Sequence, residues 1–420
     1  MNKHKNNIFR ECAFVCMIGS FLFFQIISCG SGDSSSSGSS GVTSIDQLPR
    51  ATSPVKSSAS TSMSSLGSNS VSRLNASSGS SSMHLGTLSS STFNSHSSIA
   101  ACEMSNKIRE AIRHAAKGDR IQCYVAQVVK DNPNISVDPY DGNSHVFALN
   151  FSGSSGGGPN KVKMTIQRDS SGKITHFEMA ACGGGGNGSS NTQDEYLLQT
   201  IQASDFSMVS KEKHAGDQQD DSTGGEAMRV TGTLNSSGAF INTKTMDISY
   251  KFQSNKWGIG QSKATLQQTS DTISYSGFEG GSFISQNGSG SFSDRIYAIA
   301  GLESPSDANT LDYTILGGAA HAIISGHQGS DTWSDDRKQG WASDTTVDPN
   351  SSFLAQLTQD PPAVTSVDDV NFTGNEVFDC SSASDATVNV DESSLQTACA
   401  KLELDDHGYV NCWEIIKPQN

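Results

Sequence analysis

The sequence predicts an α+β protein whose main part is an antiparallel β meander, folded as a curved or barrel-like sheet, with an N-terminal helical pair and a small disulfide-stapled C-terminal unit. Three observations lead to this fold class. Apolar residues recur at helical spacing between residues 104 and 128, polar and apolar residues alternate repeatedly after residue 141, and three cysteines lie at or beyond residue 380. Strands and helices do not alternate along the chain, so a doubly wound nucleotide-binding fold is not expected.

The helical pair is expected within residues 93–133. One apolar stripe at helical spacing consists of Met104, Ile108, Ala111, Ile112 and Ala115. Gly118 is placed to end this helix, and Asp119 to cap the next one. The second stripe consists of Ile121, Tyr124, Val125 and Val128, and Pro133 ends it. In a simple hairpin of two such helices, Cys102 and Cys123 lie at different distances from the turn, so each is expected to bond elsewhere.

The β domain is expected within residues 141–327. Val162, Met164 and Ile166 alternate with polar residues, and a turn near residues 169–172 leads to a second alternating strand with Phe177 and Met179. This pattern indicates a hairpin with one solvated face. It returns at residues 245–252, and shorter strands are expected near Ser262–Gln268, Thr272–Ser276, Ser282–Ser285, Ile296–Ala300 and Tyr313–Leu316.

Two further regions follow the sheet. Residues 328–366 are polar and acidic, and an irregular loop is expected there. Residues 367–420 are expected to form the stapled unit, with a strand at Val370–Phe372, a helix at Ser394–Leu402 and a strand at Tyr409–Ile415.

The N-terminus has the residue pattern of an export signal. Lys3, Lys5 and Arg10 precede an apolar run that ends at Ile27, which is too short for a membrane span and typical of a signal peptide. The run closes on Ser28 and Cys29, and this order resembles the lipobox of bacterial lipoproteins. The resemblance covers only the first thirty residues or so and implies nothing about the fold.

The resemblance implies removal of residues 1–28, diacylglycerol on the Cys29 thiol and a further acyl chain, such as palmitate, on its new amino group. Such chains would hold the protein on a membrane. Gly30 follows the cysteine where the family's inner-membrane signal has Asp, so in a Gram-negative host the resemblance implies the outer membrane, on its periplasmic or surface side. An ordinary secretory signal with an incidental cysteine and an uncleaved anchor are the alternatives.

Residues 29–92 are expected to form a disordered, serine-rich tether. Between Gly30 and Ser98, 29 of the 69 residues are serine. A segment of this composition cannot bury enough apolar surface to offset the entropy of ordering it.

The cysteine count indicates disulfides. Of nine cysteines, Cys12 and Cys16 leave with the signal peptide and Cys29 takes lipid. The remaining six are disulfide candidates in an oxidising compartment: Cys102, Cys123, Cys182, Cys380, Cys399 and Cys412. Cys399 with Cys412 is the preferred local pair, and Cys182 is a plausible partner for Cys102 or Cys123.

Charge and motifs exclude several functions. The net charge is −15 and no basic cluster stands out, so nucleic-acid binding is not expected. No cofactor is predicted. The Gly153–Gly157 run formally fits a nucleophile elbow but lies in a Ser/Gly loop. Weak metal or catalytic candidates are His145, His176, His321, His327, an Asp331, Asp335 and Asp336 cluster, and an EF-hand-like run at residues 403–414.

The sequence therefore favours a membrane-anchored cell-envelope lipoprotein that acts as a non-enzymatic binding or interaction module. An envelope protein, an apolar ligand or the cell wall are the expected classes of partner. A structural or adhesive surface protein is the alternative. An envelope hydrolase is a second alternative. It would need two carboxylates or a Ser–His pair that converge in one cleft.

Overall fold

A computed structural model describes residues 107–108, 117–118, 120–152, 160–170, 172, 174–183, 192–202, 205–214, 223–233, 245–268, 272–285, 288–302, 313–328, 330–342, 363–364 and 367–399. All of them belong to one compact unit within residues 40–420. The lipobox, the tether, Cys102, Cys412 and the runs at 153–157 and 403–414 lie outside the described residues.

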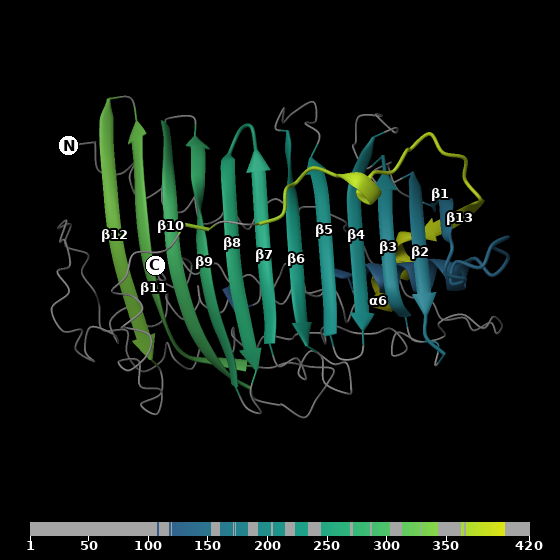
Figure 1. Ribbon diagram of the computed structural model, residues 1–420, viewed down its shortest axis with the longest axis horizontal. Helices are drawn as coiled ribbons and strands as arrows, with labels where there is room; N and C mark the ends of the chain where they lie inside the picture. The colour runs from purple at the N-terminus through teal and green to yellow at the C-terminus, as the bar shows by residue number, and fades with distance from the viewer. Residues whose placement is uncertain are drawn as a thin grey trace, which may run out of the picture. The chain divides into compact units, whose positions relative to one another are not determined.

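A 13-stranded sheet dominates this unit, in the order β12-β11-β10-β9-β8-β7-β6-β5-β4-β3-β2-β1-β13 (Figure 1). The strands are β1 Ser144–Ser152, β2 Lys161–Arg168, β3 Ile174–Cys182, β4 Gln193–Gln202, β5 Asp205–His214, β6 Gly224–Thr233, β7 Thr245–Ser254, β8 Gly258–Gln268, β9 Thr272–Ser285, β10 Gly288–Leu302, β11 Tyr313–Gln328, β12 Asp331–Ala342 and β13 Ala386–Asp391.

The expected antiparallel meander is confirmed. Strands β1 to β12 pair in chain order with antiparallel neighbours, whereas β13 pairs with β1 in parallel. The sheet is curved and open, because β12 and β13 lie at its opposite edges and do not pair with each other.

One face of the sheet carries the main core and is called here the apolar face. The alternation predicted for the first hairpin is confirmed, since Val162, Ile166, Phe177 and Met179 are all buried in this core. The same cluster continues through β4 to β10 with Leu197, Met208, Val230, Met246, Leu266, Ile273 and Ala298. The large apolar side chains of consecutive strands therefore form a continuous layer.

A helical segment packs on the apolar face. Residues 107–108, 117–118 and 120–131 are helical, and the buried side chains of Ile108, Cys123 and Ala126 join the core cluster. Gly118 lies so close to the sheet that a Cβ atom there would be 2.3 Å from the Gln199 side-chain oxygen. The helix expected after Asp119 is thus present, whereas the pairing of two helices within residues 93–133 is not shown.

The opposite face, called here the polar face, is crossed by residues 367–382. This segment, which we call the strap, is mostly without regular structure and contains one short turn of 3-10 helix, η3, at Gly374–Glu376. Figure 1 shows it in yellow in front of the central strands, with helix α6 (Glu392–Cys399) on the other side of the sheet. The chain passes from the strap through β13 into α6, and so goes around the β1 edge.

The prediction of a separate C-terminal unit is wrong for residues 367–399, the part of it that the structure describes. Residues 367–399 join the main sheet through β13, and Val370–Phe372 belongs to the strap instead of a strand. In β13, buried Val388 and Val390 alternate with exposed polar residues. The predicted helix overlaps α6, and the strand predicted at Tyr409–Ile415 lies outside the described residues.

Two disulfides fasten this C-terminal segment, one on each face. Cys182 in β3 bonds to Cys380 in the strap, and Cys123 in the helix bonds to Cys399 in α6. The preferred Cys399–Cys412 pair is therefore wrong, and Cys182 is not a partner of the N-terminal cysteines. The expectation that Cys123 staples its helix to another element is confirmed. With sequence separations of 276 and 198 residues, each bond contributes about 2–4 kcal/mol by restricting the unfolded chain.

The irregular loop expected at 328–366 is wrong for its first part, because Asp331–Ala342 is strand β12. β12 is an edge strand, and charged residues suit such an edge because they discourage pairing with other chains. Because charged residues occupy successive positions in β12, its sequence lacks the alternation of polar and apolar residues that predicts a strand.

The strands predicted at Thr272–Ser276 and Ser282–Ser285 are parts of one longer strand, β9. In the neighbouring strands, Gly290 of β10 and Gly326 of β11 lie under aromatic rings. A Cβ at Gly290 would lie 2.4 Å from the Phe283 ring, and one at Gly326 would lie 2.9 Å from the Trp333 ring. Rings that cover glycines of a neighbouring strand fill the missing side-chain volume.

Gly258 provides a test of the turn that joins β7 to β8. Its φ is 104°, in the region that favours glycine, and an added Cβ would lie 2.2 Å from the Ser282 carbonyl oxygen. We expect Gly258→Ala to lower the free energy of unfolding by about 1–3 kcal/mol, measured by urea denaturation.

Gly260→Ala is the matched control, because no atom lies within 4 Å of an added Cβ there. Its unfolding free energy should stay within about 0.5 kcal/mol of wild type. Equal losses in the two variants would contradict the described turn.

Candidate functional site: a cationic sheet face under an acidic strap

Basic side chains gather on the polar face. Cross-strand pairing connects Lys163 in β2 to Lys211 in β5 through Ala180 and Tyr196, and Lys211 to Lys251 in β7 through Ala227. Residues paired in this way share a face. By the same rule, Lys161, Lys213, Arg229 and Lys263 lie on this face as well. In a chain of net charge −15, this is a local concentration of positive charge.

The strap has the opposite charge. Among its sixteen residues are Asp368, Asp369, Glu376 and Asp379, and none is Lys or Arg. Arg229 binds both carboxylate oxygens of Asp368, at 2.9 and 3.2 Å, and the Lys251 ammonium lies 3.7 Å from the Asp369 carboxylate. These pairs are partly exposed, since the Arg229 side chain is 47% and the Asp369 side chain 62% exposed. Ion pairs of this kind stabilise a fold by about 0–1 kcal/mol each.

Lys211 holds the centre of the strap. Its ammonium donates to the Asn371 carbonyl oxygen at 3.0 Å and to the Glu376 carboxylate at 2.7 Å. The same Glu376 oxygen accepts the backbone N–H of Thr373 at 2.8 Å, which fixes the η3 turn. The Lys211 side chain is only 7% exposed, and these partners offset the cost of burying its polar end.

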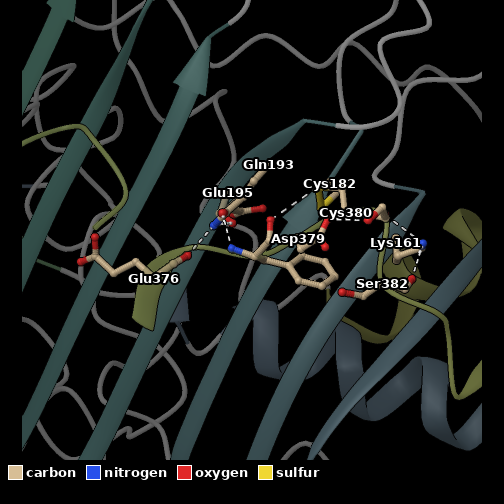
Figure 2. Close-up of a disulfide and its surroundings, with 10 residues drawn as sticks. Lys161, Cys182, Gln193, Glu195, Glu376, Asp379, Cys380 and Ser382 are labelled. Atoms are coloured by element: carbon tan, nitrogen blue, oxygen red, sulfur yellow. Dashed lines mark hydrogen bonds between the residues drawn. A yellow bond between two sulfur atoms is a disulfide. The ribbon is translucent and has the colours of Figure 1, made fainter. Parts of the chain in front are cut away.

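Gln193 forms hydrogen bonds with the backbone of the strap. Its side-chain amide donates to the Glu376 carbonyl oxygen at 2.7 Å and accepts the Phe378 backbone N–H at 2.7 Å. Figure 2 shows this amide between the two peptide groups. This pair of bonds resembles one step of a β-ladder, so Gln193 holds the strap by its backbone and not by its side chains.

The C-terminal end of the strap is fixed most firmly. Lys161 donates to the carbonyl oxygens of Cys380 at 2.9 Å and Ser382 at 2.7 Å, beside the disulfide to Cys182 (Figure 2). A small apolar cluster surrounds the disulfide, with Ala180 and Tyr196 of the sheet and Phe378 of the strap.

Two rings of the strap also contact lysines. The Lys213 ammonium lies 4.7 Å from the centre of the Phe372 ring, and the Lys163 ammonium lies 5.6 Å from that of Phe378. Such cation–π contacts contribute about 0.5–1 kcal/mol each at exposed sites. The polar face thus binds the carboxylates, the peptide groups and the rings of one acidic segment.

Ion pairs also fasten the helical segment on the apolar face. Lys117 pairs with Glu212 of β5 and with Glu195 of β4, 3.7 Å away, and Lys107 pairs with Glu279 of β9. Burial lowers the pKa of Lys117, and the carboxylates of Glu195 and Glu226 oppose this shift. The carboxylates of Glu195 and Glu212 thus share the Lys117 ammonium, and these contacts fasten the helical segment to the sheet.

The predicted histidines are not brought together. The ring of His145 lies 3.0 Å from Asp141, that of His176 lies 3.8 Å from Glu178, and that of His321 lies 2.8 Å from Asp336. His327 lies 3.3 Å from the Ser289 hydroxyl on an exposed part of the β10–β11 pair.

Within the described ranges, no group of three or more His, Cys, Asp or Glu side chains is placed to hold a metal ion. A shallow, open depression of about 330 Å³ lies at the β7–β8 turn and includes Ser254, Asn255 and Ile284 in its wall. It contains none of the predicted site residues. Over the part of the chain that is described, no helix has the length and apolar character needed to cross a membrane.

Comparison of the chain with protein-family models, with curated proteins and with solved structures found no match. The candidate site therefore rests on its own geometry. Sequence reasoning missed it, although the Lys-x-Lys pairs at 161–163 and 211–213, which put two cations on one face of a strand, were a usable signal.

Lys161→Met tests the firm end of the strap. The substitution keeps the length of the side chain but leaves two strap carbonyl oxygens without their donor. We expect the free energy of unfolding to fall by about 1–3 kcal/mol and amide exchange at residues 380–382 to accelerate.

Lys263→Met is its matched control, because Lys263 lies on the same face and has no ion pair with another described residue. It should change the unfolding free energy by less than about 0.5 kcal/mol. A Lys161→Met protein as stable as this control would show that the strap does not depend on Lys161.

Asp379 makes the stability of the fold depend on pH. Hydrogen bonds from the Ser381 hydroxyl and backbone N–H lower the pKa of Asp379. A carboxyl whose pKa is lowered by folding stabilises the fold above its unfolded pKa of about 4, and the effect is lost as the pH falls through the folded pKa. Asp379→Ala should therefore be less stable than wild type at pH 7, and the difference should shrink towards pH 2. A difference that is independent of pH would refute this role.

Proposed function

We propose that this chain is a lipid-anchored protein of the cell envelope whose sheet acts as a non-enzymatic interaction module. The order of basic residues, apolar run and Cys29 supports the anchor. The pair of disulfides supports an oxidising compartment, where such bonds persist. In a Gram-negative host, Gly30 favours the outer membrane.

The polar face is the observation that carries the interaction role. It holds an acidic, extended segment of the same chain through carboxylates, peptide groups and rings, as described above. The apolar face, by contrast, is covered by the helical segment and α6. Binding at the polar face therefore requires no change in the core.

A structural or adhesive role of the same lipoprotein is the second candidate. The depression at the β7–β8 turn is shallow, and the sheet is long and fastened by a disulfide on each face. Both features suit a rigid surface module better than a protein that encloses a small apolar ligand.

Labelling with radioactive palmitate tests the anchor. When the full chain is produced in a Gram-negative host, we expect label on the protein and recovery in the membrane fraction. Cys29→Ser should abolish both, whereas Cys16→Ser, a change within the expected signal peptide, should abolish neither. Label retained by the Cys29→Ser protein, or a mature N-terminus at another residue, would refute the lipid anchor.

A further inference from the structure

The contacts of the strap are those of a bound peptide. Arg229 and Lys211 bind its carboxylates, and Gln193 pairs with a backbone N–H and a backbone carbonyl on either side of Val377. Lys213 lies over one of its aromatic rings. A polysaccharide offers neither the alternating N–H and C=O groups nor the rings. The polar face is therefore suited to an extended acidic polypeptide.

The two ends of the strap are held differently. Phe378 and Cys380 are 6% exposed, and Cys380 is covalently bonded to Cys182 of β3. Asp368 and Asp369 are held by partly exposed ion pairs, which salt screens. Val370 is buried, the Asn371 carbonyl oxygen accepts a hydrogen bond from Lys211, and Phe372 packs against the apolar cluster around the disulfide. No disulfide holds residues 367–372, however, so they can leave the sheet more easily than residues 376–382.

Departure of the first half would uncover neighbouring cations. Arg229 in β6 and Lys251 in β7 would lose their carboxylates, and Lys263 lies one strand further on. Ser249 in β7 is paired with both Arg229 and Lys263, so these cations lie in one row on the polar face. Together they would form a cationic surface next to residues 373–382 of the strap, which stay in place.

We propose that Arg229, Lys251 and Lys263 form a binding surface for an extended acidic segment of a partner protein, which displaces residues 367–372 while the Cys182–Cys380 bond holds the rest of the strap. This inference rests on the proposed function, since it assigns a ligand class to the interaction module. Because the intact strap occupies the surface, the free wild-type protein binds such a segment weakly.

The test uses the purified full chain and a fluorescent synthetic peptide with the sequence of residues 367–376. Asp368→Asn together with Asp369→Asn removes the two carboxylates of the strap and keeps their shape. We expect this double variant to bind the peptide at least tenfold more tightly than wild type at low salt, and to lose that affinity in 0.5 M salt. Amide exchange at residues 367–372 should be faster in the double variant.

Further substitutions in the double variant locate the surface. Adding Lys251→Glu and Lys263→Glu should abolish peptide binding, whereas adding Lys130→Glu, at an exposed position on helix 120–131, should leave it unchanged. A peptide with Asn and Gln in place of its acidic residues should not bind.

Three results would overturn the proposal. They are no peptide binding by the double variant, binding that survives the Lys251→Glu and Lys263→Glu changes, and amide exchange at residues 367–372 that equals wild type. Self-association of the double variant in place of peptide binding would identify a second copy as the occupant and would also overturn it. Palmitate labelling plays no part in this experiment, so failure of peptide binding and failure of the lipid anchor are distinguishable.

Discussion

The passage of residues 367–399 around the β1 edge is the constraint on which the rest of the structure depends. The segment crosses the polar face as the strap, adds β13 in parallel to β1 and ends as α6 on the apolar face. A disulfide fastens it on each face, Cys182–Cys380 on one and Cys123–Cys399 on the other. An open meander has two exposed edges, and this passage covers the β1 edge while the Cys123–Cys399 bond connects α6 to the helix at residues 120–131.

The two faces of the sheet differ in what holds their covering segments. On the apolar face, a layer of Leu, Ile, Met and Val side chains packs against the helix, and ion pairs such as Lys117 with Glu212 lie among them. On the polar face, lysines and one arginine hold an acidic segment, whose apolar contacts are Val370 and the small cluster around the Cys182–Cys380 disulfide. Hydrophobic burial is proportional to area and insensitive to salt concentrations that screen exposed charges. Residues 367–372 of the strap, which ion pairs hold and no disulfide fastens, are therefore more readily displaced than the covering of the apolar face, and a function that needs a free surface fits the polar face.

Local patterns made much of the fold predictable. Alternation around Val162 and Phe177 predicted the first hairpin, and the stripe around Tyr124 predicted the helix, because neighbouring residues decide such elements. β12 was missed because an edge strand carries charges in place of alternation, and β9 was divided because its glycines Gly277, Gly280 and Gly281 interrupt the alternation of side chains. The disulfide partners and the site could not be predicted, since Cys182 and Cys380, or Lys211 and Glu376, meet only after the chain has returned across the sheet.

Disulfide mapping tests the account most directly. The full chain, purified without reduction and with free thiols blocked, would be digested and analysed by mass spectrometry. The account predicts one linked peptide pair containing Cys182 and Cys380 and another containing Cys123 and Cys399. A linked pair containing Cys399 and Cys412, or a free thiol at Cys182 or Cys380, would contradict it, because the C-terminal segment would then not be fastened on both faces of the sheet.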